Sequence, residues 1–170
     1  DDYEKIRYVY ETIIQQTDYD MNVPDNQNIY SVLVGKASVC QGYAKATQYL
    51  LNELGVDCSI VFGKVRDGES HSWNIVKCNG AYYHMDTTWG DASYSMNGEM
   101  LTEAEAPEIN YDYLCIPTEQ LEKTHEIKDI VELPDCDSLE DNYYVREGKY
   151  FYSYDEEQLQ RELTEAFEEG

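Results

Sequence analysis

Two runs of apolar and aromatic residues, His71–Cys78 and Ala81–Trp89, are separated by the dipeptide Asn79-Gly80. This arrangement constrains the fold more than any other feature of the chain. Asn-Gly favours the two-residue turns that join neighbouring antiparallel strands. The runs are therefore predicted to form a β-hairpin in which Cys78 pairs with Ala81.

The predicted register places His71 opposite Thr88 and Trp73 opposite Asp86. All four side chains share one face of the sheet, because side chains alternate along a strand. Diagonal neighbours on one face lie about 7–8 Å apart at the backbone, within reach of a histidine–carboxylate hydrogen bond. The hairpin therefore predicts that Asp86 orients the imidazole of His71, although a satisfied, half-buried histidine is the alternative at this position.

A helix is predicted from Ser38 to Gly55, because apolar residues recur there at three- and four-residue steps. Ser38 is the expected N-cap, with Gln41 completing a capping box, and Gly55 ends the helix. Cys40 is then second inside the helix, where free backbone N–H groups and the helix dipole lower the pKa of a thiol. A buried structural cysteine stays open as the alternative.

The remaining segments are predicted from their apolar spacing and turn residues. The expected elements are helices over Glu4–Gln16 and Asp155–Glu169, strands over Cys58–Val65 and Tyr111–Ile116, one or two helical turns over Pro117–Lys123, an acidic loop over Gly90–Asn110, an acidic linker over Pro134–Asp141 and a Tyr-rich hairpin over Asn142–Tyr154. They indicate an α+β domain over residues 1–133 and a small hairpin–helix extension over residues 134–170.

The chain is strongly acidic, with a net charge of −23 from 12 basic and 35 acidic residues. Such a charge disfavours binding to nucleic acid or to anionic membrane surfaces. No apolar run is long enough to insert in a membrane. The high tyrosine and low lysine content and the start at Asp1 favour a segment of a longer exported bacterial protein, with other domains in the parent chain. We therefore expect an extracellular or cell-surface location.

The five cysteines contain no C-x-x-C pair, which argues against a zinc ribbon or a thioredoxin-type site. Their pattern does not say which of them, if any, form disulfides; the four besides Cys40 are Cys58, Cys78, Cys115 and Cys136.

No cofactor and no metal is predicted. The stretch that begins at Asp18 resembles the opening of a calcium loop, but Val23 and Ile29 stand where glycine and glutamate are needed. A competing chemical interpretation is a zinc site held by Cys40, His71, His84 and Asp86. Outside that alternative, His84 and His125 are interpreted as structural histidines.

Cys40, His71 and Asp86 form the set that thiol-based acyl transfer needs: a nucleophile, a base within reach and a carboxylate that orients the base. The sequence around them resembles the transglutaminase-like superfamily in three blocks in the usual order. These blocks are Val39-Cys40-Gln41-Gly42-Tyr43-Ala44, His71-Ser72-Trp73-Asn74-Ile75-Val76 and Tyr83-His84-Met85-Asp86-Thr87-Thr88-Trp89. Their spacing suits the compact microbial branch, and the resemblance extends from about Asp18 to His125.

The resemblance implies a papain-like α+β core in which the cysteine helix packs on an antiparallel sheet. It implies that Cys40 is the nucleophile, His71 the general base and acid, and Asp86 the orienting residue. The expected activity is thiol acyl transfer on peptide or glutamine amides through a thioester, which water or a primary amine resolves. Hydrolysis is expected over cross-linking, because cross-linking needs a dry acceptor tunnel.

A non-catalytic module that binds polypeptide or cell-wall material in a larger surface protein is the alternative function. Drift usually erases a nucleophile that is not used, so the complete set of three residues argues against it.

Animal members of the superfamily stabilise the oxyanion with a tryptophan well before the cysteine, and no tryptophan precedes Cys40. Gln27 is the predicted replacement, since its amide can donate beside the Cys40 backbone N–H; an ordinary polar loop residue is the alternative. Trp73 and Trp89 are predicted to line the substrate groove and shield the imidazole of His71, with plain core aromatics as the alternative.

Overall fold

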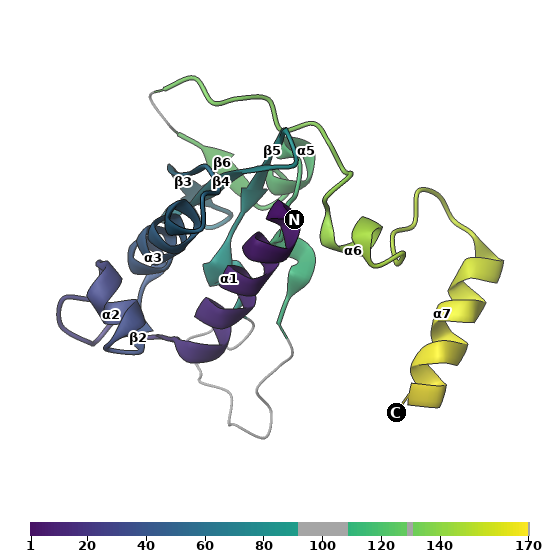
Figure 1. Cartoon of the computed structure of the whole chain (residues 1–170), viewed down its shortest axis with the longest axis horizontal. Coiled ribbons are helices and arrows are strands. Elements are labelled where there is room, and N and C mark those ends of the chain that lie inside the picture. The colour runs from purple at the N-terminus through teal and green to yellow at the C-terminus, as the bar shows by residue number, and fades with distance from the viewer. Residues whose placement is uncertain (92–108, 129–130, 170) are drawn as a thin grey trace.

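The computed structural model describes residues 1–91, 109–128 and 131–169 (Figure 1). The helices are α1 (Asp2–Gln16), α2 (Ile29–Leu33), α3 (Cys40–Glu53), α4 (Thr87–Gly90), α5 (Thr118–Leu121), α6 (Tyr143–Arg146) and α7 (Glu156–Glu169), with a 3₁₀ turn, η1, over Tyr111–Tyr113. The strands are β1 (Asp18–Tyr19), β2 (Ala37–Ser38), β3 (Cys58–Val65), β4 (Ser70–Cys78), β5 (Ala81–Met85) and β6 (His125–Ile127).

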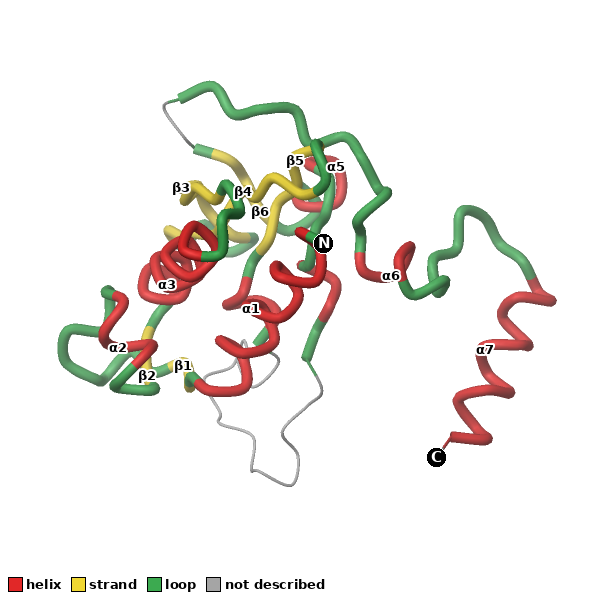
Figure 2. The backbone as a smooth tube through the Cα atoms, viewed as in Figure 1, coloured by secondary structure: helices red, strands yellow, loops and turns green. Residues whose placement is uncertain are grey.

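The fold is α+β, as expected. Four strands form an antiparallel sheet in the order β5-β4-β3-β6, and α3 packs against β3 and β4 with α1 beside it (Figure 2). The apolar stripe of α1 supplies Ile6, Tyr10 and Ile13 to the core, each no more than 2% exposed. The predicted helix over Glu4–Gln16 is thus confirmed and begins two residues earlier, where Asp1 caps it.

The predicted hairpin and its register are confirmed from Cys78 opposite Ala81 as far as Asn74 opposite Met85. The predicted strand over Cys58–Val65 is confirmed as β3. All described backbone pairing in the four-stranded sheet is antiparallel. Strand β4 lies between β5 and β3, and α3 packs against it.

The hairpin ends earlier than predicted. Asp86 is the N-cap of α4, and its Oδ1 accepts hydrogen bonds from the backbone N–H groups of Thr88 (2.9 Å) and Trp89 (3.1 Å). The expected pairs Trp73–Asp86 and His71–Thr88 are therefore wrong, because the capping carboxylate turns the chain off the sheet into a helical turn.

The start of α3 also differs from its prediction. The N-cap is Val39, without a side-chain hydrogen bond, so the predicted Ser38 cap and its capping box with Gln41 are wrong. The Ser38 hydroxyl instead donates to the Asn26 carbonyl at 2.7 Å. Because Ser38 belongs to β2, Cys40 is the first helical residue rather than the second. The backbone N–H groups around Cys40 nonetheless remain those of a helix N-terminus.

Two predictions for the segment after residue 108 are wrong. The expected strand over Tyr111–Ile116 is the turn η1 followed by a single bridge between Ile116 and His84. The expected Tyr-rich hairpin is the short helix α6, in which Tyr143 stacks on Tyr111 with ring centroids 3.7 Å apart. This stacking anchors α6 to η1, which local strand propensity could not anticipate. Most of the predicted loop over Gly90–Asn110 lies outside the described residues.

The C-terminal helix is confirmed as α7, which stands apart from the sheet in Figure 1. The predicted turn over Pro117–Lys123 is confirmed as α5. The segment between them packs on the first part of the chain: the Thr118 N–H donates to the Cys136 carbonyl, and the Asp141 carboxylate accepts from Asn79. The boundary after residue 133 stays a prediction. All five cysteines carry free thiols, and none of the described helices is long and apolar enough to cross a membrane.

Gly42 allows the first turn of α3 to lie close to β2. A Cβ at this position would meet Ser38 Oγ at 1.9 Å and the Asn26 carbonyl oxygen at 3.1 Å. Gly42→Ala is therefore expected to lower the free energy of unfolding by about 2 kcal/mol, because the added methyl group overpacks this contact. At an open helix position the same substitution would instead stabilise the protein by about 1 kcal/mol, since alanine has the higher helix propensity. Urea denaturation measures this. The exposed helix-end substitution Glu53→Ala is the control and should change little; a stabilised Gly42→Ala variant would contradict the packing described.

Candidate active site

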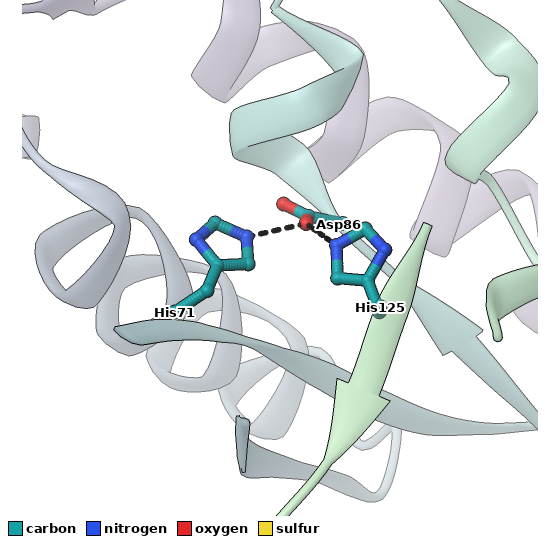
Figure 3. A group of neighbouring side chains, drawn as sticks. All are labelled: His71, Asp86 and His125. Carbon is teal, nitrogen blue, oxygen red and sulfur yellow. Dashed lines mark hydrogen bonds and ion pairs between the residues drawn. The ribbon is translucent and has the colours of Figure 1, made fainter. Parts of the chain in front are cut away.

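Three separate elements bring a thiol, an imidazole and a carboxylate together. Cys40 begins α3, His71 lies on β4, and Asp86 lies where β5 passes into α4. The Nε2 atom of His71 is 2.6 Å from Asp86 Oδ2 (Figure 3). The Cys40 thiol lies close enough to the same imidazole for each group to shift the pKa of the other. The sequence-predicted set is therefore assembled in space, with the imidazole between sulfur and carboxylate.

Helix α3 is tied to strand β4 by a side chain from the histidine block itself. The Asn74 Nδ2 atom, fully buried, donates to the Ala44 carbonyl of α3 at 2.9 Å. A buried amide without partners would cost free energy, so this bond fixes the distance between helix and strand. Cys40 and His71 stand at the same end of these two elements, and the bond holds their contact in place.

The thiol and the imidazole shift each other's pKa. Burial raises the pKa of Cys40, but hydrogen bonds and charge from His71, together with hydrogen bonding from Ser72, outweigh burial and bring that pKa below its ordinary value. Burial lowers the pKa of His71, but the charge and hydrogen bond of Asp86, aided by Cys40, raise the pKa of His71 to about 10. Both shifts favour the thiolate–imidazolium pair over the neutral pair.

Asp86 is buried, and its carboxylate accepts hydrogen bonds on both oxygens. Oδ1 takes the two backbone N–H groups of the α4 turn, and Oδ2 takes His71 and a second histidine, His125, at 3.0 Å. Burial raises the pKa of Asp86, but the two histidines outweigh it and hold that pKa well below its usual range. Asp86 is therefore an anion at all physiological pH values.

His125 is a member of the cluster that sequence reasoning interpreted as merely structural. It lies on β6, with its ring near that of His71 at a centroid distance of 5.4 Å (Figure 3). The ring of Trp89 is also close to it, with centroids 4.8 Å apart. No local pattern indicated this, because the pairing of β6 with β3 joins segments about sixty residues apart. His84 has other partners: it accepts from Trp73 Nε1 at 3.2 Å and contacts Thr118 Oγ1, in keeping with a structural role.

The two tryptophans and Gln27 occupy different surroundings. Trp73 is 1% exposed and packs behind His71, with ring centroids 6.0 Å apart, so it is a core residue and does not line a groove. Trp89 is partly exposed and lies against His125. Gln27 is exposed, and its carbonyl accepts from Lys45 of α3. It directly follows Asn26, whose carbonyl accepts the Val39 N–H, so Gln27 lies beside the start of the cysteine helix.

The three groups in Figure 3 include ligand types that bind metals, and their nearest atoms lie within 4.8 Å of one another. However, two atoms that bind one tetrahedral zinc at about 2.0–2.1 Å lie about 3.3 Å apart. The 2.6 Å separation of His71 Nε2 and Asp86 Oδ2 is shorter and is that of a hydrogen bond. The zinc set considered from sequence also fails geometrically, since His84 is held by Trp73 and Thr118 instead.

A family model described as the transglutaminase-like superfamily matches residues 1–87, just over half of the 170 residues. The chain belongs to this superfamily. The matched range contains Cys40, His71 and Asp86 and ends well before His125. It also includes α1, which the resemblance noted from the sequence blocks did not reach. Membership of the superfamily supports a cysteine-type enzyme in general terms.

The solved structures to which the chain is similar include the following three. A candidate cysteine protease from Cytophaga hutchinsonii shares 19% identity, with a TM-score of 0.46 over 51% of this chain and 31% of that one. A protein described as a TGase shares 16%, with a TM-score of 0.43 over 60% and 34%. Legionella pneumophila LapG, treated with EGTA, shares 10%, with a TM-score of 0.41 over 86% and 78%. The chain spans about a third of the length of the first two. No curated protein matches.

Selective alkylation tests the thiol's environment. Because His71 lowers the pKa of Cys40, we expect iodoacetamide at pH 6 to label Cys40 several-fold faster than a model thiol. Cys58 and Cys136 are buried, and burial raises the pKa of each to about 12, so both should stay unlabelled in the folded protein. Peptide mapping by mass spectrometry measures this. His71→Ala should remove the advantage of Cys40; equal labelling of Cys40 and the model thiol in the unsubstituted protein would contradict it.

Proposed function

We propose that this chain is a cysteine-dependent acyl-transfer enzyme that hydrolyses peptide or glutamine amides. The observation that carries the proposal is an imidazole anchored 2.6 Å from a buried carboxylate, beside a thiol whose pKa this imidazole lowers. Cys40 is also the partly exposed cysteine, whereas the other four are buried. Accessibility, a lowered thiol pKa and a fixed base are the three requirements of a thiol nucleophile.

In the first half-reaction, the Cys40 thiolate attacks the carbonyl carbon of the substrate amide. The C–S bond forms as the carbonyl electron pair moves to oxygen. We assign the stabilisation of this oxyanion to the Cys40 backbone N–H, which is free of helical partners at the first position of α3, and to the Gln27 side-chain amide. His71 then gives its proton to the leaving nitrogen, the C–N bond breaks, and a thioester remains.

In the second half-reaction, water attacks the thioester and His71 takes one of its protons. The C–S bond then breaks, the acid product leaves, and the sulfur returns to the thiolate while His71 is again protonated. Asp86 stays ionised throughout and keeps the imidazole in one orientation. A primary amine in place of water would give transfer instead of hydrolysis. Because Cys40 is partly exposed, water can reach the thioester, which supports hydrolysis.

The charge of the chain supports a polypeptide substrate with neutral or basic character. A net charge of −23 repels acidic chains and attracts basic ones at low ionic strength. The same composition supports an exported protein at the cell surface, acting beside other domains of a longer parent chain. A non-catalytic binding module finds less support, because Cys40 is partly exposed whereas the other four cysteines are buried.

A panel of candidate peptides and glutamine-containing peptides tests the reaction. We expect product formation by the unsubstituted protein, and a loss of at least about a thousandfold in Cys40→Ala, as for other thiol and serine enzymes that lose their nucleophile. Cys136→Ala, which removes a buried thiol, is the matched control and should keep activity. Reaction in ¹⁸O-labelled water should place the label in the acid product, and an added amine should compete poorly.

Two outcomes would contradict the proposal. Equal turnover by the unsubstituted chain and Cys40→Ala would show that the thiol is not the nucleophile. If the product formed in ¹⁸O-labelled water with added amine carries the amine and no ¹⁸O, the reaction is transfer to the amine rather than hydrolysis.

A further inference from the structure

Two histidines share a single oxygen atom of the buried carboxylate, although a nucleophile–base–acid arrangement needs only one. His71 Nε2 and His125 Nε2 lie 2.6 Å and 3.0 Å from Asp86 Oδ2 (Figure 3). The other oxygen is occupied by the two N–H groups of the α4 turn. A carboxylate offers about four acceptor positions, so Asp86 has none left for water. This saturation fixes its position and divides its charge among four donors.

The ring of His125 is itself held from three sides. Its backbone lies on β6 opposite Val65 of β3, its Nδ1 is 2.8 Å from the Thr124 hydroxyl, and its ring packs on Trp89. The single proton of that hydroxyl can point to the Leu121 carbonyl oxygen at 3.3 Å or to the nearer Nδ1. When it points to Nδ1, the proton of a neutral His125 resides on Nε2 and points at Asp86. The side chain is buried, so water cannot replace this donor.

We propose that His125 is a positioning residue for the acyl-transfer reaction, an inference that rests on the proposed function. By donating to Asp86 Oδ2, His125 holds the carboxylate against His71 and withdraws part of the negative charge that His71 would otherwise face alone. His71 must give its proton to the leaving nitrogen, and an imidazolium too strongly paired with its carboxylate gives that proton up slowly. His125 thus keeps the imidazole oriented without making it too weak an acid.

The groups around His71 allow the effect of His125 to be separated from others. Cys40 faces His71 from α3, Asp86 from the end of β5 and His125 from β6, whereas β3 places the uncharged Gly63 opposite it. Tyr113 of η1 lies near His125, and Tyr10 of α1 lies near Asp86. Burial raises the pKa of both tyrosines, which disfavours their ionisation while His71 titrates.

The chain contains only three histidines, which makes NMR of their ring protons a direct test. The leucine variant His125→Leu removes the donor and keeps a side chain of similar volume, whereas His125→Gln keeps an N–H donor. With the donor gone, Oδ2 presents more charge to His71, and we expect the pKa of His71 to rise by about one unit in His125→Leu. In His125→Gln it should move by less than half of that. His84→Gln, which alters a buried histidine that does not touch Asp86, should leave the pKa of His71 unchanged.

The sign of the shift separates positioning from a packing role. If His125 only filled space, the leucine variant would leave the pKa of His71 in place; if His71 became exposed, its pKa would fall toward the ordinary value. Either result overturns the proposal. Turnover of the peptide substrate should fall about tenfold or more in His125→Leu and recover in His125→Gln. Where His125→Leu fails to fold by circular dichroism, ¹⁵N spectra of the unsubstituted protein decide: a neutral His125 protonated on Nδ1 rather than Nε2 overturns the proposal, and protonation on Nε2 supports it.

The same samples distinguish the two levels of inference. Alkylation of Cys40 at pH 6 reports the thiolate–imidazolium pair independently of turnover. If Cys40 in the unsubstituted protein reacts no faster than a model thiol, the proposed function fails and the role of His125 fails with it. If Cys40 is activated and His125→Leu leaves both its reactivity and the pKa of His71 unchanged, the role of His125 alone fails.

Discussion

The buried carboxylate of Asp86 is the interaction on which the site geometry depends. An ionised carboxylate away from water is costly unless every acceptor position is used. The chain meets this requirement with donors from three elements: the first turn of α4, strand β4 through His71 and strand β6 through His125. Each donor is directional, so satisfying the charge also fixes how these elements meet. The carboxylate that orients the His71 imidazole is thereby also a constraint on how α4, β4 and β6 pack together.

This double role explains where the sequence-based prediction of the hairpin held and where it failed. Asn79-Gly80 and the alternation of the flanking strands fixed the register near the turn, and the structure follows that register to Asn74 and Met85. Beyond Met85, strand propensity competed with helix capping by Asp86, and capping prevailed because it satisfies two backbone N–H groups at once. The contact of Asp86 with His71 was nevertheless predicted. Whether the chain continues as a strand or turns into a helix after Met85, Asp86 stays at the end of the hairpin near His71.

The cysteine helix shows the same balance between local pattern and tertiary context. Its apolar spacing and its end near Gly55 could be predicted from the sequence, because both depend on residues within the helix. Its exact cap could not, because Ser38 is drawn away by β2 and by the Asn26 carbonyl, a contact twelve residues distant. The Tyr-rich segment failed for a similar reason: the stacking of Tyr143 on Tyr111 is a long-range contact that strand propensity does not contain.

His125 marks the limit of reading a site from motifs. The three sequence blocks of the superfamily themselves contain Cys40, His71 and Asp86. His125 lies outside these blocks and reaches Asp86 only because β6 pairs with β3. The local sequence Thr124-His125-Glu126 carries no signal that Asp86 is the partner of this histidine. Its place in the fold has a physical consequence all the same: a carboxylate with one histidine and a free acceptor position would need water in a buried site. A second ring closes that position, and the pairing of β6 with β3 becomes part of what holds the imidazole of His71 beside Cys40.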